Sequence, residues 1–453
     1  MIFTKFSIKN FKSFKTEQYL LFAKPVSNRE GSGLTYIVGA NNSGKTTIIE
    51  GLSIKNNRKI KSSELVSRSD CPEFALYEEE NVVRKCVLIR PESYTIEENP
   101  RLSDEEQFEI ISSRRHWEST ANRSLSSVGE SFISSHEFQN RQSSIEVASE
   151  LKAIEADSKK YGEFIQLVKR VIPEFSKFAV GYEDYEYIEY VSASGIHHKS
   201  ELLGDGVITI IRILLQLFVN KKNPLIIDEP ELSLHPSAQR KLLKVIAEYS
   251  IERQIVISTH SPYFIDWNYL ESGAVLNRIV KQNDTYSQIY SIEDFSLYSS
   301  LIKAANWQQP FLMDEVAKEI FFTEDKIIFL EGQEDVGLLK RESVFTNANI
   351  FGYGVRGKDN FKLFVSLAHK IGFKEVACLL DNGENETEIK KELEADFPSY
   401  KIVQWNRDDI RDKDIISYPV KNGYFTQAGT KKNDSELDDY NLKITAINDY
   451  FSK

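Results

Sequence analysis

The sequence contains little cysteine and no long apolar run. Its 453 residues include three cysteines, Cys71, Cys86 and Cys378, which lie far apart and form no C-x-x-C pair. They are too few for a disulfide framework or a cysteine zinc site, and we expect them to pack as small apolar side chains. No apolar run approaches the roughly 20 residues of a membrane-spanning helix, and the first residues lack a signal-peptide pattern. We therefore expect a cytoplasmic protein with no membrane partner.

The sequence also contains fewer basic than acidic residues. The chain has 57 Lys and Arg against 68 Asp and Glu, a net charge of −11 at pH 7. Because nucleic-acid binding depends on clustered Lys and Arg, this balance argues against a uniformly basic surface but leaves room for a local basic groove. The sequence has no sustained heptads, which disfavours long coiled-coil arms. A chain of 453 residues is too long for one core, so we expect about two or three domains.

A phosphate-binding motif closes the first fifty residues. Residues 39–46 read Gly-Ala-Asn-Asn-Ser-Gly-Lys-Thr and match G-x-x-x-x-G-K-[ST], with an apolar strand-like run before them and a helix-like turn after them. In this context backbone N–H groups cradle the phosphates of ATP, Lys45 reaches the phosphate oxygens and Thr46 holds Mg²⁺. The alternative is a glycine-rich turn that matches by chance. The predicted nucleotide-binding residues are Gly39, Asn41, Asn42, Ser43, Gly44, Lys45, Thr46 and Thr47.

Two later strands end in residues that suit the same chemistry. An apolar run at 224–227 leads into Asp228 and Glu229, which would hold the water shell of Mg²⁺ and activate the attacking water, respectively. A second run at 254–258 leads into His260, which can bond the γ-phosphate and sense its loss. The alternative for Asp228 and Glu229 is a buried strand that simply ends in two acids. The alternative for His260 is a structural histidine. We predict an ATPase with Lys45, Glu229 and His260 as its catalytic residues.

Other segments predict the framework around these motifs. Residues 2–22 alternate apolar and polar side chains and predict a β-hairpin, and residues 75–90 predict further strands. Apolar residues at helical spacing within 160–172 predict an amphipathic helix that stops at Pro173. Residues 182–191, rich in Tyr and Glu, predict a pair of strands.

A polar insertion separates the first motif from the others. From about 91 to 158 the chain is rich in Ser, Glu and Arg, and we expect a helical insertion within about 91–180. Residues 114–117, Arg-Arg-His-Trp, fit either a small nucleic-acid patch or a solvated helix face.

The order of the motifs resembles the ABC-type ATPase heads of the recombination and chromosome-maintenance superfamily. Residues 228–236, Asp-Glu-Pro-Glu-Leu-Ser-Leu-His-Pro, are most similar to the OLD (overcoming lysogenisation defect) family. The resemblance implies a two-lobed head that dimerises head to head, so that the signature segment of one subunit closes over ATP held by Lys45 of the other. The signature here lacks its usual serine, which implies slow hydrolysis. Its residues are Gly204, Asp205 and Gly206.

The resemblance to the OLD family also implies a second domain. An apolar strand at 326–330 runs into Glu331 and Asp335, which resembles the first motif of the metal-dependent Toprim domain, and Asp381 follows a later strand. A nucleic-acid-cleaving Toprim site usually carries Asp-x-Asp there, since two Mg²⁺ ions need several converging carboxylates. This chain has Asn382 and Gly383 instead. The candidate metal ligands are Glu331, Asp335 and Asp381.

Further residues bear on whether this second domain cuts nucleic acid. Asp414 stands where OLD proteins often place a glutamate before an aromatic residue, and Lys358 or Lys421 can approach a phosphate. Loss of one carboxylate usually cripples two-metal chemistry, so we expect a Toprim-like domain that does not cut by itself. The polar, acidic segment 426–453 fits a docking helix.

The sequence therefore predicts an α/β protein with two parts. Residues 1–322 form a two-lobed ABC-type P-loop ATPase head, and residues 323–453 form a smaller Toprim-like α/β domain. This combination resembles the ATPase subunits of the Septu anti-phage systems, in which a separate HNH nuclease does the cutting. The resemblance implies an ATP- and Mg²⁺-dependent sensor and scaffold with an HNH partner and DNA. The alternatives are a self-sufficient ATP-regulated OLD-type nuclease and a DNA-repair or chromosome-structuring ATPase.

Overall fold

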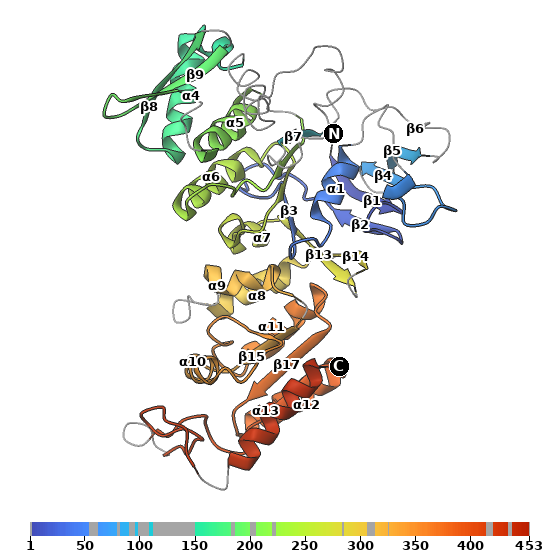
Figure 1. The fold of residues 1–453 in the computed structure, drawn as a ribbon, viewed down its shortest axis with the longest axis vertical. Coiled ribbons are helices and arrows are strands. Elements are labelled where there is room, and N and C mark those ends of the chain that lie inside the picture. The colour runs from blue at the N-terminus through green and yellow to red at the C-terminus, as the bar shows by residue number, and fades with distance from the viewer. Residues whose placement is uncertain are drawn as a thin grey trace, which may run out of the picture. The chain divides into compact units, whose positions relative to one another are not determined.

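The structure is a computed structural model in which the chain forms two compact units. The N-terminal unit comprises Met1–Ile37 and Lys45–Val275, and the C-terminal unit comprises Val38–Gly44 and Leu276–Lys453. Figure 1 shows the elements of each unit. The described residues are 2–53, 62–78, 82–89, 96–97, 108–111, 150–182, 186–199, 205–219, 223–282, 285–305, 313–324, 326–413, 420–433 and 437–452.

A parallel sheet forms the centre of the N-terminal unit. Three of its strands are buried along their whole length, as expected for a sheet covered on both faces. Parallel pairing aligns their carboxyl ends, so the residues that follow each strand meet at one edge of the sheet. Within the described residues the sheet has six strands, and the four that lie in this unit are, in spatial order, β3 (Leu34–Val38), β12 (Ile255–Ser258), β11 (Leu225–Asp228) and β7 (Glu109–Ile111).

Helices with clear sequence signals accompany this sheet. The side chain of Asp157 accepts hydrogen bonds from the first turn of α4 (Ser158–Val171), whose apolar residues are buried, so the predicted amphipathic helix is confirmed. His235 caps α6 (Pro236–Tyr249), and the proline at its first position suits a helix start. The other two long helices of the unit are α1 (Lys45–Leu52) and α5 (Asp205–Val219).

Two antiparallel sheets complete the N-terminal unit. In the first, β1 (Phe3–Lys9) pairs with β2 (Gln18–Leu21), which confirms the predicted hairpin, and β4 (Glu73–Glu78) pairs with β1 and β5 (Val82–Ile89). The short β6 (Ile96–Glu97) pairs with β5. The second sheet has the order β10, β9, β8. Its strands are β8 (Phe175–Tyr182), β9 (Glu186–Ser192) and β10 (His197–Lys199).

Two predictions about these segments were wrong in part. The strand pair expected within 182–191 is one strand, β9, because its partners β8 and β10 precede and follow that range. The insertion expected to be helical contains α4 but also β7, which pairs with β11 of the central sheet. Residues 98–107 and 112–149, with the Arg-Arg-His-Trp segment, lie outside the described residues.

The C-terminal unit contains a hairpin followed by a second parallel sheet. The hairpin pairs β13 (Val275–Gln282) with β14 (Tyr286–Ile292), and α8 (Phe295–Ala305) and α9 (Glu315–Lys318) follow. The sheet has the order β16, β15, β17, β18, with every pair parallel, and the strands predicted at 326–330 and before Asp381 are β15 and β17. Its strands are β15 (Lys326–Leu330), β16 (Asn349–Ile350), β17 (Glu375–Leu380) and β18 (Lys401–Gln404).

Helices α10 (Gln333–Glu342), α11 (Asn360–Lys370), α12 (Glu384–Asp396) and α13 (Leu437–Phe451) belong with this sheet. The segment expected to be a docking helix is α13, and it buries Tyr440 and Ile447 in the core of its own unit. There the Trp405 and Tyr440 rings stack with centroids 5.5 Å apart. This packing anchors the loop after β18 to the sheet.

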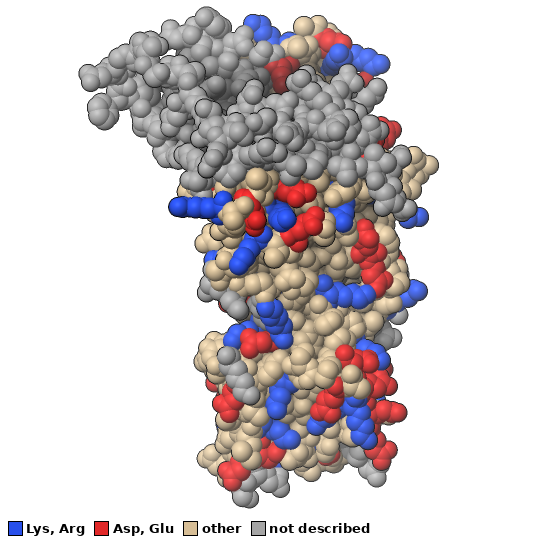
Figure 2. All heavy atoms as spheres, turned by 90° about the vertical axis from the view of Figure 1, so that its right-hand side faces the viewer, with Lys and Arg blue, Asp and Glu red and all other residues tan. Residues whose placement is uncertain are grey.

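The surface agrees with the charge balance of the sequence. On the face drawn in Figure 2, acidic and basic side chains of the described residues are interspersed. None of the helices in the described ranges is long and apolar enough to cross a membrane.

Candidate functional site

The phosphate-binding loop joins β3 to α1 through residues in unusual backbone conformations. Gly39 and Gly44 have φ values of +144° and +114°, and Asn42 has a φ of +59°. A Cβ atom on Gly39 would lie 2.3 Å from the carbonyl oxygen of Ile279, so only glycine fits there. Because of these glycines, the backbone of the loop can come close to a phosphate, as the sequence motif predicts.

The loop ends at Lys45, the first residue of α1. The side chain of Lys45 is buried, and its Nζ lies 3.5 Å from Nδ1 of His260, which follows β12. Nε2 of His260 in turn lies 3.6 Å from Oε1 of Glu229, which follows β11. The structure therefore brings the three predicted catalytic side chains together at the carboxyl ends of adjacent parallel strands. Asp228, buried at the end of β11, lies beside them.

Burial and the neighbouring carboxylates act in opposite directions on the charge of Lys45. Burial lowers the pKa of Lys45 to about 8, and the carboxylates of Glu229, Glu231 and Asp228 oppose that shift. A buried lysine held charged by several acids gains a strong partner when a triphosphate arrives. The backbone of Glu229 has a φ of +46°, a strained conformation for a residue with a side chain. Such strain is often found at functional sites.

Glu231 belongs to the site, although the sequence analysis assigned it no role. Its Oε1 accepts a 2.6 Å hydrogen bond from the backbone N–H of His260, and its Oε2 accepts a 2.8 Å bond from the Thr259 hydroxyl. Burial raises the pKa of Glu231 to about 7, and these hydrogen bonds oppose the rise. Glu231 therefore joins the loop after β11 to the end of β12 and fixes the position of the His260 backbone. The only sequence signal was its place in the Asp-Glu-Pro-Glu run.

The predicted signature segment is described only in part. Gly204 lies outside the described residues, and Asp205 is the first residue of α5. A Cβ atom on Gly206 would lie 2.4 Å from the carbonyl oxygen of Ser233, so α5 begins in close contact with the segment after the two acids. Within one chain, this places Gly206 against the segment that follows Asp228 and Glu229.

A second group of acids lies at the carboxyl ends of the C-terminal sheet. Glu331 follows β15, Asp335 lies in the first turn of α10 and Asp381 follows β17. Burial raises the pKa of each of these acids, and for Asp335 and Asp381 repulsion from the other carboxylates and from Asp409 adds to the rise. Asp409, buried in the loop after β18, was missed because nothing in the sequence shows where that loop returns.

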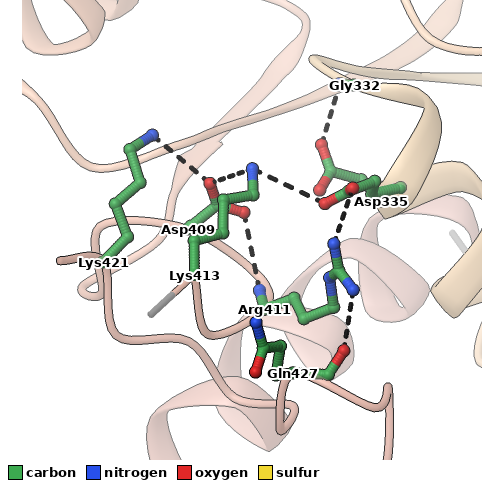
Figure 3. A network of polar contacts seen from close by, with 8 residues as sticks. Gly332, Asp335, Asp409, Arg411, Lys413, Lys421 and Gln427 are labelled. Carbon is green, nitrogen blue, oxygen red and sulfur yellow. Dashed lines mark hydrogen bonds and ion pairs between the residues drawn. The ribbon is translucent and has the colours of Figure 1, made fainter. Parts of the chain in front are cut away.

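The same acids do not fit a divalent metal ion as they stand. Oδ2 of Asp409 lies 2.6 Å from Lys413 Nζ and 3.3 Å from Lys421 Nζ, contacts that are drawn as dashed lines in Figure 3. Oδ2 of Asp335 accepts a 2.8 Å bond from the backbone N–H of Gly332. In the part of the chain that the structure describes, no group of three or more His, Cys, Asp and Glu side chains could hold a metal ion.

The two lysines that were expected to approach a phosphate each pair with an acid. Nζ of Lys358 lies 3.8 Å from Oε1 of Glu386. Lys421 pairs with Asp409, while Asp414 lies outside the described residues.

Comparisons with known proteins support an ATPase. Residues 90–266 match the model of the AAA domain, putative AbiEii toxin, Type IV TA system, and residues 1–111 match the model of the AAA ATPase domain. A curated relative, "Endonuclease GajA" of Bacillus cereus (strain HuB5-5), is 25% identical over 225 residues. That match covers 43% of this chain and only 31% of the relative, so the chain spans about a third of its length.

Among solved structures, the SMC head domain from Thermotoga maritima is 16% identical with a TM-score of 0.39, and covers 65% of this chain and 100% of that one. The Smc head domain bound to the C-terminal domain of ScpA, derived from Pyrococcus furiosus, is 15% identical with a TM-score of 0.44, and covers 66% and 98%. From the two family matches and the phosphate-binding loop, the chain contains an α/β ATPase domain with a P-loop.

The lowered pKa of Lys45 predicts pH-dependent ATP binding. Below pH 8 the lysine is already charged, whereas above it ATP must bind together with a proton, so affinity is lost as pH rises through about 8. We expect the dissociation constant of a fluorescent ATP analogue to rise about tenfold between about pH 7 and 9. Lys45→Arg, whose side chain stays charged, should show a flat profile. An equal slope in both proteins would contradict this assignment.

The contacts of Glu231 predict a role in positioning His260. Glu231→Ala leaves the His260 N–H and the Thr259 hydroxyl without their acceptor, so we expect kcat for ATP hydrolysis to fall about tenfold to a hundredfold with little change in KM. Glu231→Gln, which keeps one acceptor oxygen, should restore much of kcat. The matched control is Glu248→Ala, an acid of α6 that pairs with Arg170. Unchanged kcat in Glu231→Ala would refute the role.

Proposed function

We propose that this protein is an ATP-binding, slowly hydrolysing sensor and scaffold in a bacterial anti-phage complex, where it recruits or regulates a separate HNH nuclease. The observation that carries the proposal is that part of the phosphate-binding loop belongs to the C-terminal unit. Residues Val38–Gly44 and the C-terminal sheet lie in one compact unit. Nucleotide state at the loop therefore has a direct physical route to the domain that would hold a partner.

The route begins at the hairpin of β13 and β14. The Ser287 hydroxyl on β14 donates a hydrogen bond to the backbone carbonyl of Ser43 in the loop. Gly39 approaches the carbonyl of Ile279 on β13 so closely that no side chain fits between them. A loop held at both ends by one hairpin cannot rearrange around a phosphate without straining that hairpin.

The route continues from the hairpin through Arg278. This arginine is almost fully buried, donates bonds of 2.8 Å to the carbonyl of Ile371 and 2.7 Å to the carbonyl of Thr323, and lies over the Phe373 ring. Lys374 also donates to the side chain of Gln282. Charge-assisted bonds from a buried guanidinium are strong and directional, so β13 is firmly joined to the segment after α11.

The P-loop and the strand ends near it supply the ATP chemistry in this proposal. Lys45 and the loop amides would bind the phosphates, and Thr46 and Asp228 would hold Mg²⁺, which would neutralise phosphate charge. Glu229 orients and deprotonates the attacking water, and His260 contacts the γ-phosphate. Gly204, Asp205 and Gly206 of a second copy would close over the nucleotide in a head-to-head dimer. Because this signature lacks serine, hydrolysis is slow and the ATP-bound assembly is long-lived.

The C-terminal domain, residues 323–453, is the scaffold in this proposal. Its order of strands and acids suits a Toprim-like domain, but Asn382 replaces a carboxylate and Asp409 is already paired with lysines. It therefore resembles the corresponding domain of PtuA, the ATPase subunit of Septu systems, with DNA and an HNH nuclease as partners. ATP binding would favour one arrangement of that complex over another.

A second candidate is a self-sufficient, ATP-regulated nuclease of the OLD type with Glu331, Asp335 and Asp381 as its metal ligands. The observation in its favour is the 25% identity to a relative that is named an endonuclease. A DNA-repair or chromosome-structuring role has less support, because the sequence lacks the heptads of long coiled-coil arms.

Plasmid cleavage separates the two candidates. We expect purified protein with Mg²⁺ or Mn²⁺ and ATP to leave supercoiled plasmid intact, because its acids do not converge on a metal, and to support cutting only when an HNH nuclease subunit is added. Lys45→Ala should remove the effect of ATP on that cutting. Robust cleavage by the protein alone that Glu331→Ala abolishes would reject the scaffold and establish the second candidate.

A further inference from the structure

The loop after β18 brings a buried charge into the C-terminal carboxylate group. Asp409 has only 2% of its surface exposed, and an ion pair between Arg411 and Glu334 joins its loop to the first turn of α10, which also carries Asp335. An ionised carboxylate in such a place is strongly unfavourable unless a cation is paired with it. The identity of that cation decides what the site can do.

The structure places two lysines on Asp409. Lys413 Nζ lies 2.6 Å from Oδ2 of Asp409 and 3.5 Å from Oε2 of Glu334, so it bridges two acids. Lys421 Nζ lies 3.3 Å from the same Oδ2. Backbone hydrogen bonds between Lys413 and Lys421 hold the two residues side by side, and Figure 3 shows both ammonium groups directed at Asp409.

A neighbouring arginine strengthens this arrangement. Arg411 donates a 2.8 Å bond to Oε1 of Glu334, in the first turn of α10, and a 2.7 Å bond to the backbone carbonyl of Gln427. Its guanidinium therefore fastens the segment carrying Lys413 to the helix that carries Asp335. Held in this way, the lysines need little further ordering to stay on the acid, so their pairing loses little entropy.

We propose that Lys413 and Lys421 are the built-in cations of this carboxylate group and take the place that a divalent metal ion holds in a metal-dependent nuclease site. The inference deepens the proposed scaffold function and rests on it. The domain then keeps its fold and its charge balance without Mg²⁺ or Mn²⁺. A lysine ammonium neutralises a carboxylate but cannot polarise a phosphate or activate water as a metal ion does, so the site is structural.

The proposal predicts that removing the lysines creates affinity for a metal ion. Two positive charges beside the acids repel an incoming divalent cation, and their removal ends that repulsion and leaves Asp409 and Glu334 without these counter-charges. Lys413→Met with Lys421→Met keeps much of the apolar stem of each side chain and deletes both charges. We expect this double variant to bind Mn²⁺ about tenfold more tightly than the wild type, or more.

The experiment measures bound Mn²⁺ by electron paramagnetic resonance on the full chain without nucleotide, so that the ATP site contributes no metal. The wild type should bind no stoichiometric Mn²⁺ at millimolar concentration, and the double variant should bind it. The matched control is Lys362→Met, a lysine of α11 that also pairs with two acids, Glu392 and Asp396, and it should behave as the wild type. If the double variant does not fold, Lys421→Met alone, at the more exposed lysine, is measured in its place.

Two results would overturn the proposal. The first is stoichiometric Mn²⁺ binding by the wild type that Asp381→Asn removes. The second is a folded lysine variant, double or single, whose Mn²⁺ affinity equals that of the wild type. Neither result bears on ATP-dependent recruitment of a nuclease, which the plasmid experiment tests separately, so failure here is distinguishable from failure of the proposed function.

Discussion

The account depends on one constraint, the attachment of the phosphate-binding loop to the hairpin of β13 and β14. Ser287 bonds the carbonyl of Ser43, and Gly39 lies against the carbonyl of Ile279 with no room for a side chain. Residues 39–44 of the loop thus belong to the same compact unit as the C-terminal sheet. Arg278 extends that attachment to the segment after α11. In the proposed function, this attachment would carry the nucleotide state of the loop to the C-terminal sheet.

Both units place acids at the carboxyl ends of a parallel sheet, but their negative charge is balanced differently in each unit. In the N-terminal unit Lys45 is buried beside Glu229, Glu231 and Asp228, a setting in which a triphosphate is a favourable additional partner. In the C-terminal unit Asp409 already has Lys413 and Lys421 as counter-charges. The first arrangement suits catalysis on a phosphate, and the second suits a stable framework.

The sequence predicted features that neighbouring residues form, but it did not predict contacts between loops that lie far apart in the chain. The phosphate-binding loop could be predicted because its glycines, lysine and flanking apolar runs lie within about twenty residues. Glu231 was quoted but given no role, because its partners at Thr259 and His260 are set by strand pairing. Asp409 was missed for the same reason. The acidic end of the chain was expected to dock, but Tyr440 stacks on Trp405 in its own core, a contact that spacing alone does not reveal.

Hydrogen–deuterium exchange of the full chain with and without Mg²⁺ and ATP tests the central claim most directly. The account predicts that ATP slows exchange in the loop at 39–44 and also at 276–282 and 371–374, because hydrogen bonds connect these segments, and that Lys45→Ala abolishes every change. Slowed exchange confined to the loop and the N-terminal unit, with 371–374 unchanged in the wild type, would contradict it.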